Sequence, residues 1–268
     1  MLFLRYRHGD AEGYAVLAGD RVQPIEGDLF GDHAPRGEAL PLDAVRVLAP
    51  LRPGKILAAA VNYPSHVSES KKMLGDREAP PQPELFLKPS SSVIGPDETI
   101  VLPAGVRRVD YEGELVAVIG RAPTGARPGD CRNVSVEGAL DYVFGYTCGN
   151  DISARHWQRD DLQWWRAKGS DTFSPIGPYV ATGLDPTDLE LRTRLNGEQV
   201  QATNTGALIH SLAKLVSHAS RAMTLEPGDL VFTGTPGETG RLSDGDVVEV
   251  EVQGVGVLRN PVRAEGVE

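Results

Sequence analysis

Three carboxylates alternate along one stretch of the chain that then becomes apolar. Asp110, Glu112 and Glu114 precede a run of apolar residues that ends before Gly120. Such a run indicates a strand that enters the core, and alternate side chains of a strand share a face. Carboxylates at the end of a buried strand repel one another unless they take up protons or bind a cation. A hard divalent cation with oxygen ligands would answer this need, whereas an acidic strand end exposed to solvent would bind nothing.

An imidazole and a carboxylate three residues apart form a second candidate group. Pro64 and Ser65 favour the start of a helix, which would place His66 and Glu69 on one helical face. A carboxylate beside an imidazole raises its basicity and fixes its orientation, as a general base requires. The alternative is an ordinary surface pair that contributes roughly a few tenths of a kcal/mol to the helix.

A further carboxylate follows another strand-like segment. Asp151 lies where this strand gives way to a helix. It could cap that helix, or it could join Glu112 and Glu114. Arg155 and Gln158 lie on the next turn and could face the same point as Asp151.

Two lysines and a Gly/Thr turn offer groups for an anion. Lys88 ends a short strand-like segment, and Lys168 lies just before the turn Gly169-Ser170. Lysines in such places are commonly exposed, but a functional Lys168 would bind an anionic substrate group. The turn at residues 234–240 follows an apolar segment and could present backbone N–H groups to an anion, although a plain loop is the simpler interpretation.

The remaining pattern predicts many short strands and few helices. The chain has 30 glycines and 20 prolines, which favour turns. Asn196-Gly197 is a strong hairpin signal, and apolar residues at helical spacing predict a helix at residues 207–223. The other predicted elements are a β meander with strands at 2–7, 13–17 and 21–24, a connector at 27–40, buried strands at 55–61, 109–120 and 230–233, a strand-like segment at 139–149, and a hairpin at 247–252 and 255–259.

The composition argues against several classes of protein. A net charge of −10 is unfavourable for a nucleic-acid-binding protein with a broad basic surface, although a local pocket can still be basic. Cys131 and Cys148 indicate neither a metal site nor a disulfide framework. The first residues lack the apolar core of a signal peptide, and no window is long enough to span a membrane. We therefore expect a soluble cytoplasmic protein with no nucleic-acid or membrane partner.

Six motifs, in order, resemble those of the fumarylacetoacetate hydrolase (FAH) family from about residue 50 to the C-terminus. They are Asn62-Tyr63-x-x-His66-x-x-Glu69, Phe86-x-Lys88-Pro89, Asp110-Tyr111-Glu112-x-Glu114-Leu115, Asn150-Asp151-x-Ser153-Ala154-Arg155-x-x-Gln158, Lys168-x-x-Asp171-Thr172-Phe173 and Gly234-Thr235-Pro236. Each motif is weak alone, but six in order are specific. The chain departs from the family pattern after Pro236, where Gly237-Glu238-Thr239-Gly240 replaces a short apolar Gly-Val-Gly turn.

The resemblance implies a fold, a metal site and a set of active-site residues. The fold would be α+β and mostly β, a mixed β-roll or sandwich core with few helices, in a homodimer. A small N-terminal β subdomain at residues 1–50 would precede a catalytic domain at residues 51–268. The metal, Mg²⁺ or Mn²⁺, would be held by Glu112, Glu114 and Asp151. The implied catalytic residues are His66, Glu69 and Lys168, and the implied substrate-binding residues are Tyr63, Lys88, Arg155, Gln158 and Thr235.

The implied substrates are small 2-oxo acids or their enols, which react through a metal-stabilised enolate. With His66 as base, oriented by Glu69, water would cleave a C–C bond of an acylpyruvate or a fumarylpyruvate-like acid. The alternatives are decarboxylation, as of oxaloacetate, and isomerisation of an unsaturated dioic acid from aromatic breakdown, such as 2-hydroxyhepta-2,4-diene-1,7-dioate. A metal-binding protein without catalysis is the non-enzyme alternative. The presence of both His66 and Glu69 favours hydrolysis or decarboxylation over isomerisation alone.

The proposed base lies in a segment with the composition of a loop. Residues 64–84 are polar and rich in proline, so they offer little to bury. We expect this segment to act as a lid that closes over the metal site when substrate binds.

Overall fold

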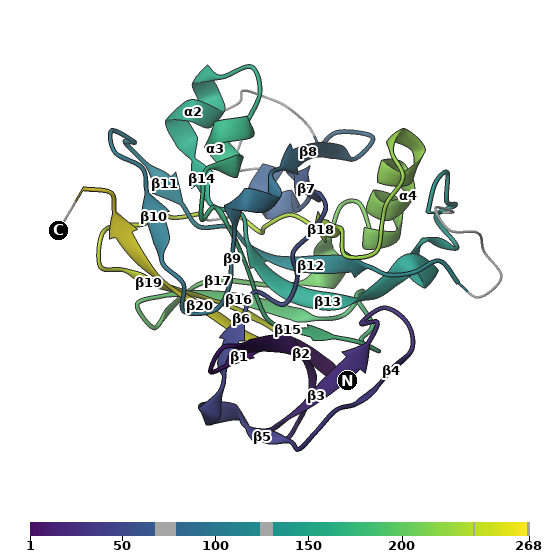
Figure 1. Cartoon of the computed structure of the whole chain (residues 1–268). Coiled ribbons are helices and arrows are strands. Elements are labelled where there is room, and N and C mark those ends of the chain that lie inside the picture. Colours follow the sequence, from purple (N-terminus) through teal and green to yellow (C-terminus); the bar gives the residue numbers. More distant parts are fainter. Residues whose placement is uncertain (68–78, 124–130, 238, 267–268) are drawn as a thin grey trace.

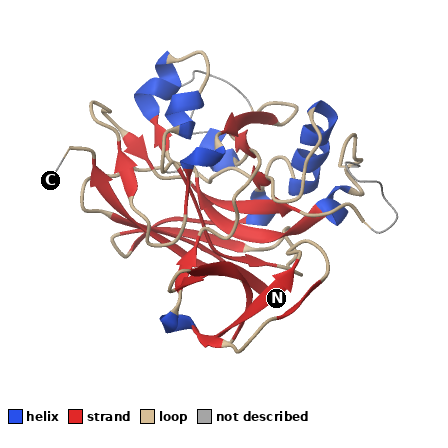
Figure 2. Cartoon of the chain, viewed as in Figure 1, coloured by secondary structure: helices blue, strands red, loops and turns tan. Residues whose placement is uncertain are grey.

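Strands dominate the fold, and the few helices are short. The computed structural model describes residues 1–67, 79–123, 131–237 and 239–266. Figure 2 shows strands throughout the body of the molecule and the helices gathered mainly along one side. This confirms the predicted fold class, α+β and mostly β. None of the helices in these ranges has the length and apolar character that crossing a bilayer requires.

A large mixed sheet carries the acidic strand near its centre. β12 (Gly113–Ile119) pairs antiparallel with β13 on one side and with β18 on the other. All seven residues of β12 are buried, because both faces of the sheet are covered. The rest of the path from β12 runs through β13 (Val143–Asn150) to β15 (Ser174–Ala181), and through β18 (Leu230–Phe232) and β7 (Ile56–Ala60) to β8 (Glu84–Lys88).

The N-terminal strands extend this sheet beyond β15. β1 pairs antiparallel with β15, where Leu2 lies opposite Ala181. The three predicted strands are confirmed, and the predicted connector at 27–40 contains short strands of its own. The N-terminal strands, purple and blue in Figure 1, are β1 (Leu2–His8), β2 (Ala11–Ala18), β3 (Arg21–Gly27), β4 (His33–Pro35), β5 (Leu40–Pro41) and β6 (Arg46–Leu48). The division of the chain at residues 50 and 51 stays a prediction.

A second sheet packs against the first and closes the core. The predicted hairpin at Asn196-Gly197 is confirmed, and both residues have the positive φ, 53° and 83°, that such a tight turn requires. Leu115 and Ile119 of β12 share one buried cluster with Leu191, Val250 and Leu258 of the second sheet. Its strands, in order, are β10 (Ile100–Leu102), β20 (Gly256–Ala264), β19 (Val247–Val252), β16 (Glu190–Leu195) and β17 (Glu198–Asn204).

The helices are shorter than the sequence pattern predicts. The helix predicted at 207–223 is α4 (Leu212–Ala222), which begins five residues later. The Ser211 side chain accepts a hydrogen bond from the backbone N–H of Lys214 and so caps the helix, while residues 205–207 form a separate 3₁₀ turn. The segment predicted as a strand at 139–149 likewise begins with a 3₁₀ turn at Ala139–Tyr142. The other α-helices whose bounds both lie in the described residues are α2 (Arg155–Asp160) and α3 (Trp165–Gly169).

The acidic stretch is two strands rather than one. β11 (Val109–Asp110) pairs with β14 (Ser153–Ala154) in a small sheet of its own, and β12 begins only at Gly113. Tyr111 donates its backbone N–H to Gly240, and the N–H of Glu112 bonds the Asn150 side chain, so this part of the backbone leaves the ladder. The prediction of a single strand over 109–120 is therefore wrong at residues 111–112.

Candidate metal centre and active site

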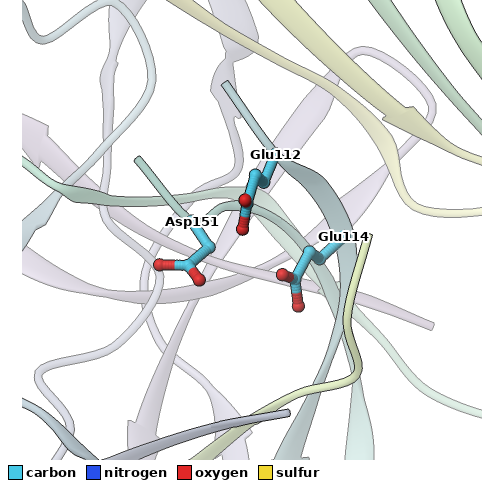
Figure 3. Close-up of side chains that lie close together, drawn as sticks. All are labelled: Glu112, Glu114 and Asp151. Carbon is cyan, nitrogen blue, oxygen red and sulfur yellow. The ribbon is translucent and has the colours of Figure 1, made fainter. Parts of the chain in front are cut away.

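Three buried carboxylates meet at the beginning of β12. Ligand atoms of Glu112, Glu114 and Asp151 all lie within 4.8 Å of one another, and none of these residues is more than 4% exposed. Glu112 and Glu114 are two residues apart in the chain, and Asp151 directly follows β13. Pairing of Gly113 with Asn150 brings Asp151 beside the two glutamates. Figure 3 shows the three side chains converging on a common point.

Asp110 does not join this cluster, although it alternates with the two glutamates in sequence. The break after β11 directs its buried side chain toward two arginines. Arg108 contacts both carboxylate oxygens, at 2.7 and 2.9 Å, and Arg155 Nε donates to Oδ2 at 2.8 Å. The carboxylate of Asp110 therefore forms ion pairs with two guanidinium groups instead of joining the cluster.

Cationic side chains lie against two of the three carboxylates. Lys168 Nζ is 2.6 Å from both Glu112 Oε2 and Asp151 Oδ2. Arg155 Nη2 forms an ion pair with Glu112 Oε1 at 2.7 Å. Lys88, whose side chain is fully buried, donates to Asp151 Oδ1 and to the backbone carbonyl of Phe173.

Glu114 is the carboxylate with the least compensation. Burial raises its pKa well above the ordinary value, and repulsion from Asp151 and Glu112 adds to the effect. The backbone N–H of Gly234 donates to its Oε2 at 2.6 Å but does not offset these effects. Burial acts in the same direction on Glu112, but Lys168 and Arg155 outweigh it and lower the pKa of Glu112.

This electrostatic pattern fits a divalent cation. The donor set is three carboxylates with no nitrogen or sulfur, which suits Mg²⁺ or Mn²⁺. A cation among them would favour the charged form of Glu114, whose pKa burial and repulsion raise. The residues implied by the family resemblance as metal ligands therefore form one site that could hold such an ion.

The Tyr63 hydroxyl is buried close to this site. Tyr63 is 1% exposed, and its hydroxyl has no hydrogen-bond partner among the described residues. Burial and the nearby charge of Glu114 raise its pKa. Such a hydroxyl could donate a hydrogen bond to a water molecule or to a substrate oxygen.

Asn62 fixes the turn that carries Tyr63. Its side chain donates to the carbonyls of His210 and Thr233, at 2.9 and 2.8 Å, and accepts the His210 backbone N–H at 2.8 Å. Val61 immediately before it has a positive φ of 52°, a conformation that needs such support in a β-branched residue. Sequence reasoning included Asn62 in a motif but gave it no role.

A pocket of about 410 Å³ opens above the cluster. Glu112 and Lys168 lie in its lining, and His66, Arg155, Gln158 and Thr235 line it as well. Its apolar side includes Phe86 and Trp164, whose rings meet edge to face at 5.4 Å. Tyr63 and Lys88 are absent from the lining, and Lys88 lies behind Asp151. Glu69 and most of the predicted lid lie outside the described residues.

The outer lining of the pocket is strongly basic. Arg107, Arg108, Arg159 and His156 line it, besides Arg155 and Lys168, whereas Glu112 is the one carboxylate that the described residues contribute to that lining. Arg159 forms a bidentate pair with Asp160, and Arg108 pairs with Asp110. Sequence reasoning missed these rim residues, although Arg107-Arg108 directly precedes the acidic stretch.

Two predicted substrate-binding side chains, Gln158 and Thr235, already form hydrogen bonds within the protein. Gln158 Oε1 accepts from Arg155 Nη1 at 2.9 Å, which leaves the Gln158 NH₂ as the group able to donate elsewhere. The Thr235 hydroxyl donates to the Gly113 carbonyl at 2.9 Å and accepts from Gln201 at 3.0 Å. In the turn at residues 234–240, which could present N–H groups to an anion, the Gly234 N–H donates to the Glu114 carboxylate. The substrate contacts assigned to these residues stay predictions.

The chain matches known proteins over nearly its whole length. Residues 55–263 match the model described as fumarylacetoacetate (FAA) hydrolase C-terminal, and residues 1–50 match one described as Rv2993c-like, N-terminal. The chain is 42% identical to a Mycobacterium smegmatis structure named 5-carboxymethyl-2-hydroxymuconate delta-isomerase, with a TM-score of 0.89 over 99% of this chain and 100% of that one.

Other relatives carry different activity names. An oxaloacetate tautomerase of Xenopus laevis is 37% identical over 81% of this chain and 68% of its own length. A maleylpyruvate hydrolase of Sphingobium sp. SYK-6, solved with manganese(II) and pyruvate, is 29% identical with a TM-score of 0.77 over 98% of this chain and 99% of that one. The relatives thus include proteins named as an isomerase, a tautomerase and a hydrolase. The chain is a member of the fumarylacetoacetate hydrolase family.

Proposed function

We propose that the protein is a divalent-metal-dependent enzyme that acts on a small 2-oxo acid with a second anionic group, through its enolate. The observation that carries this proposal is the buried cluster of Glu112, Glu114 and Asp151 at the base of a pocket with a basic lining. A divalent cation bound there would supply a Lewis acid that makes enolate formation easier. The manganese and pyruvate bound by a relative support both the ion and the class of substrate.

Charge balance supports a substrate with more than one negative charge. Four cations, Lys88, Lys168, Arg155 and Arg108, match in number the three carboxylates of the cluster and Asp110, so a divalent ion would leave the site with an excess of positive charge. Arg107 adds positive charge toward the outside of the pocket, and Arg159 beside it has its charge partly offset by Asp160. A small dianion would neutralise the excess positive charge at the metal site, and the basic residues of the rim would attract it electrostatically.

The chain's own groups would bind and orient such a substrate. Lys168 uses two of its three N–H bonds on Glu112 and Asp151, which leaves one for a substrate carboxylate. The Gln158 NH₂ and the Tyr63 hydroxyl would donate to further oxygens. His66 lines the same pocket and would move the proton on carbon or oxygen. Phe86 and Trp164 would exclude water from one side of the substrate.

Proton movement alone, as in keto–enol conversion or isomerisation, is the reaction that the comparisons favour. The relatives named isomerase and tautomerase are 42% and 37% identical, whereas the maleylpyruvate hydrolase is 29% identical. The second candidate is C–C hydrolysis of an acylpyruvate or a fumarylpyruvate-like acid, which the sequence motifs favour through His66 and Glu69. His66 in the pocket lining supports that candidate, and decarboxylation of oxaloacetate needs the same enolate.

One panel of assays separates these reactions and tests the metal. Oxaloacetate, acetylpyruvate and fumarylpyruvate would each be assayed with Mg²⁺ and with Mn²⁺, following enol–keto conversion, carboxylate loss and C–C cleavage separately. Glu114→Gln should abolish every activity, because it removes one of three ligands, while the protein stays folded. Glu198→Gln, an exposed glutamate on β17, is the matched control. Full activity of Glu114→Gln, or of the unaltered chain in excess chelator, would refute the proposed metal site.

A further inference from the structure

Arg155 is held by side chains from three separate segments. Its Nε donates to Asp110 of β11 at 2.8 Å, its Nη2 donates to the Thr239 hydroxyl at 2.8 Å, and its Nη1 donates to Gln158 of α2 at 2.9 Å. Arg155 is 7% exposed. A guanidinium has a rigid planar arrangement of donors, so three bonds in different directions fix its orientation.

Thr239 links the other two members of this set. Its hydroxyl accepts from Arg155 and donates to Asp110 Oδ2 at 3.3 Å. The loop that carries Thr239 is anchored on β11, because Tyr111 donates to the Gly240 carbonyl and Leu242 donates to Val109. Thr239 stands in the segment where this chain departs from the apolar Gly-Val-Gly turn of the family pattern.

The fixed guanidinium lies on one oxygen of a proposed metal ligand. Arg155 Nη2 is 2.7 Å from Glu112 Oε1, while Glu112 Oε2 accepts from Lys168 at 2.6 Å, and Lys168 also donates to Asp151 of the carboxylate cluster. The two oxygens of Glu112 thus have different cationic neighbours: Oε1 forms the ion pair with Arg155, and Oε2 is bonded to the lysine that it shares with Asp151. Asp110 also supplies the negative charge that offsets Arg155 beside a site for a cation.

We propose that Asp110 and Thr239 are positioning residues that hold Arg155 against Glu112 Oε1, so that Glu112 offers Oε2 to the divalent ion. The inference rests on the proposed function, because it takes Glu112 as a metal ligand. Neither residue touches the substrate in this proposal. Both act through Arg155, as partners behind metal ligands commonly do.

Mn²⁺ affinity measured by titration calorimetry on the metal-free protein tests the proposal without an activity assay. Asp110→Asn should weaken Mn²⁺ binding by roughly 10- to 100-fold, the range found for partners behind metal ligands, because Arg155 is released and its charge is no longer offset. Thr239→Val, which keeps the size of the side chain, should weaken binding by a smaller factor, roughly tenfold, the low end of that range. Thr239→Ser keeps the hydroxyl and should restore most of the affinity.

A matched pair on the surface provides the control. Thr187 donates its hydroxyl to Asp185 at 2.7 Å far from the carboxylate cluster in sequence, and Thr187→Val and Asp185→Asn should leave Mn²⁺ affinity unchanged. In proton–nitrogen spectra, the Arg155 Nε–H should exchange slowly with solvent in the unaltered chain and faster in Asp110→Asn. This signal reports the orientation of Arg155 in variants whose unfolding temperature is unchanged.

The outcomes separate this inference from the proposed function. Failure of the unaltered chain to bind Mn²⁺ would overturn both. Normal Mn²⁺ binding by the unaltered chain together with equal affinity in Thr239→Val would overturn the positioning role alone. If Asp110→Asn does not fold, Thr239→Val and Thr239→Ser still decide the question, because they remove and restore one hydroxyl.

Discussion

The ammonium of Lys168 lies 2.6 Å from Asp151 Oδ2, where neither side chain is more than 3% exposed. The pair joins the end of α3 to the residue that follows β13. Burial alone would lower the pKa of Lys168, but Asp151 and Glu112 outweigh it and raise that pKa. The lysine is therefore a fixed positive charge within the carboxylate cluster.

Removal of this charge should destabilise the metal-free protein. Lys168→Met leaves Asp151 and Glu112 buried with less compensation, and breaking a buried ion pair on one side costs about 3–5 kcal/mol. The free energy of unfolding would be measured by urea titration in chelator and again with excess Mn²⁺. We expect Mn²⁺ to restore much of the lost stability, because it binds the folded state. Equal stability of the variant and the unaltered chain in chelator would contradict this account of the site.

Replacement of the pocket histidine should distinguish the two candidate reactions. If His66 is the base of C–C hydrolysis, His66→Ala should lose that activity by about 10²- to 10⁴-fold, the usual scale for a general base. Enol–keto conversion should suffer less, since the ion contributes most to that step. Parallel assays of acylpyruvate cleavage and oxaloacetate tautomerisation give the comparison. An equal loss of both would assign His66 a role other than hydrolytic base.

The basic rim should affect diacids more than monoacids. Arg107→Gln and Arg159→Gln each remove a partly solvated charge, so each should lower kcat/KM for oxaloacetate by about two- to fivefold, within the range of exposed ion pairs. Acetylpyruvate, which has one carboxylate, should be affected less, and added salt should narrow the difference. Arg36→Gln on the N-terminal part is the control. Equal losses for both substrates would argue against a second anionic group in the natural substrate.

A histidine outside the active site should make stability depend on pH. His210 is 5% exposed, its Nε2 lies 2.9 Å from the Pro80 carbonyl, and its Nδ1 lies 3.1 Å from Lys214 Nζ. These contacts suit a neutral imidazole that donates through Nε2 and accepts through Nδ1. Burial lowers the pKa of His210 below its ordinary value of 6.5, and Lys214 adds to this effect against the opposing Pro80 contact.

The sign of the pH effect follows from linkage. Below pH 6.5 the unfolded chain protonates this histidine while the folded chain resists, so folding stability should fall as the pH drops from about 6.5 through the lower folded pKa. His210→Gln should flatten that part of the stability curve, measured by urea titration across pH, whereas His8→Gln, an exposed histidine of β1, should not. A curve with the same slope in His210→Gln would assign the effect to other groups.

The sequence predicts part of the site because strands alternate their side chains. Glu112 and Glu114 share a face for that reason, and the apolar residues after them predict the buried strand correctly. Asp151 stayed ambiguous between a cap and a ligand because its position depends on the register of β13 against β12, which pairs residues 37 positions apart at Gly113 and Asn150. Asp110 goes to a different sheet through a backbone contact between Tyr111 and Gly240, which no local pattern indicates.

A local turn and side chains from distant segments account for the rest. α4 begins only at Leu212, because the 3₁₀ turn at residues 205–207 interrupts an apolar pattern that continues through Leu208. The basic rim gathers Arg107, Arg159 and His156 from two segments whose approach is set by the pairing of β11 with β14. Composition gave the opposite impression, since the whole chain has a net charge of −10.

Phe3 connects the first strand to the strand that carries the carboxylate site. Phe3 is 2% exposed and shares one buried cluster with Val116 and Val118, which alternate with Glu114 along β12. A shortened chain that starts at residue 51 would lose this ring and leave the end of β15 without its neighbour β1. The catalytic part would then carry an unprotected sheet edge, which is prone to self-association. The N-terminal strands thus support the sheet that positions the carboxylate site.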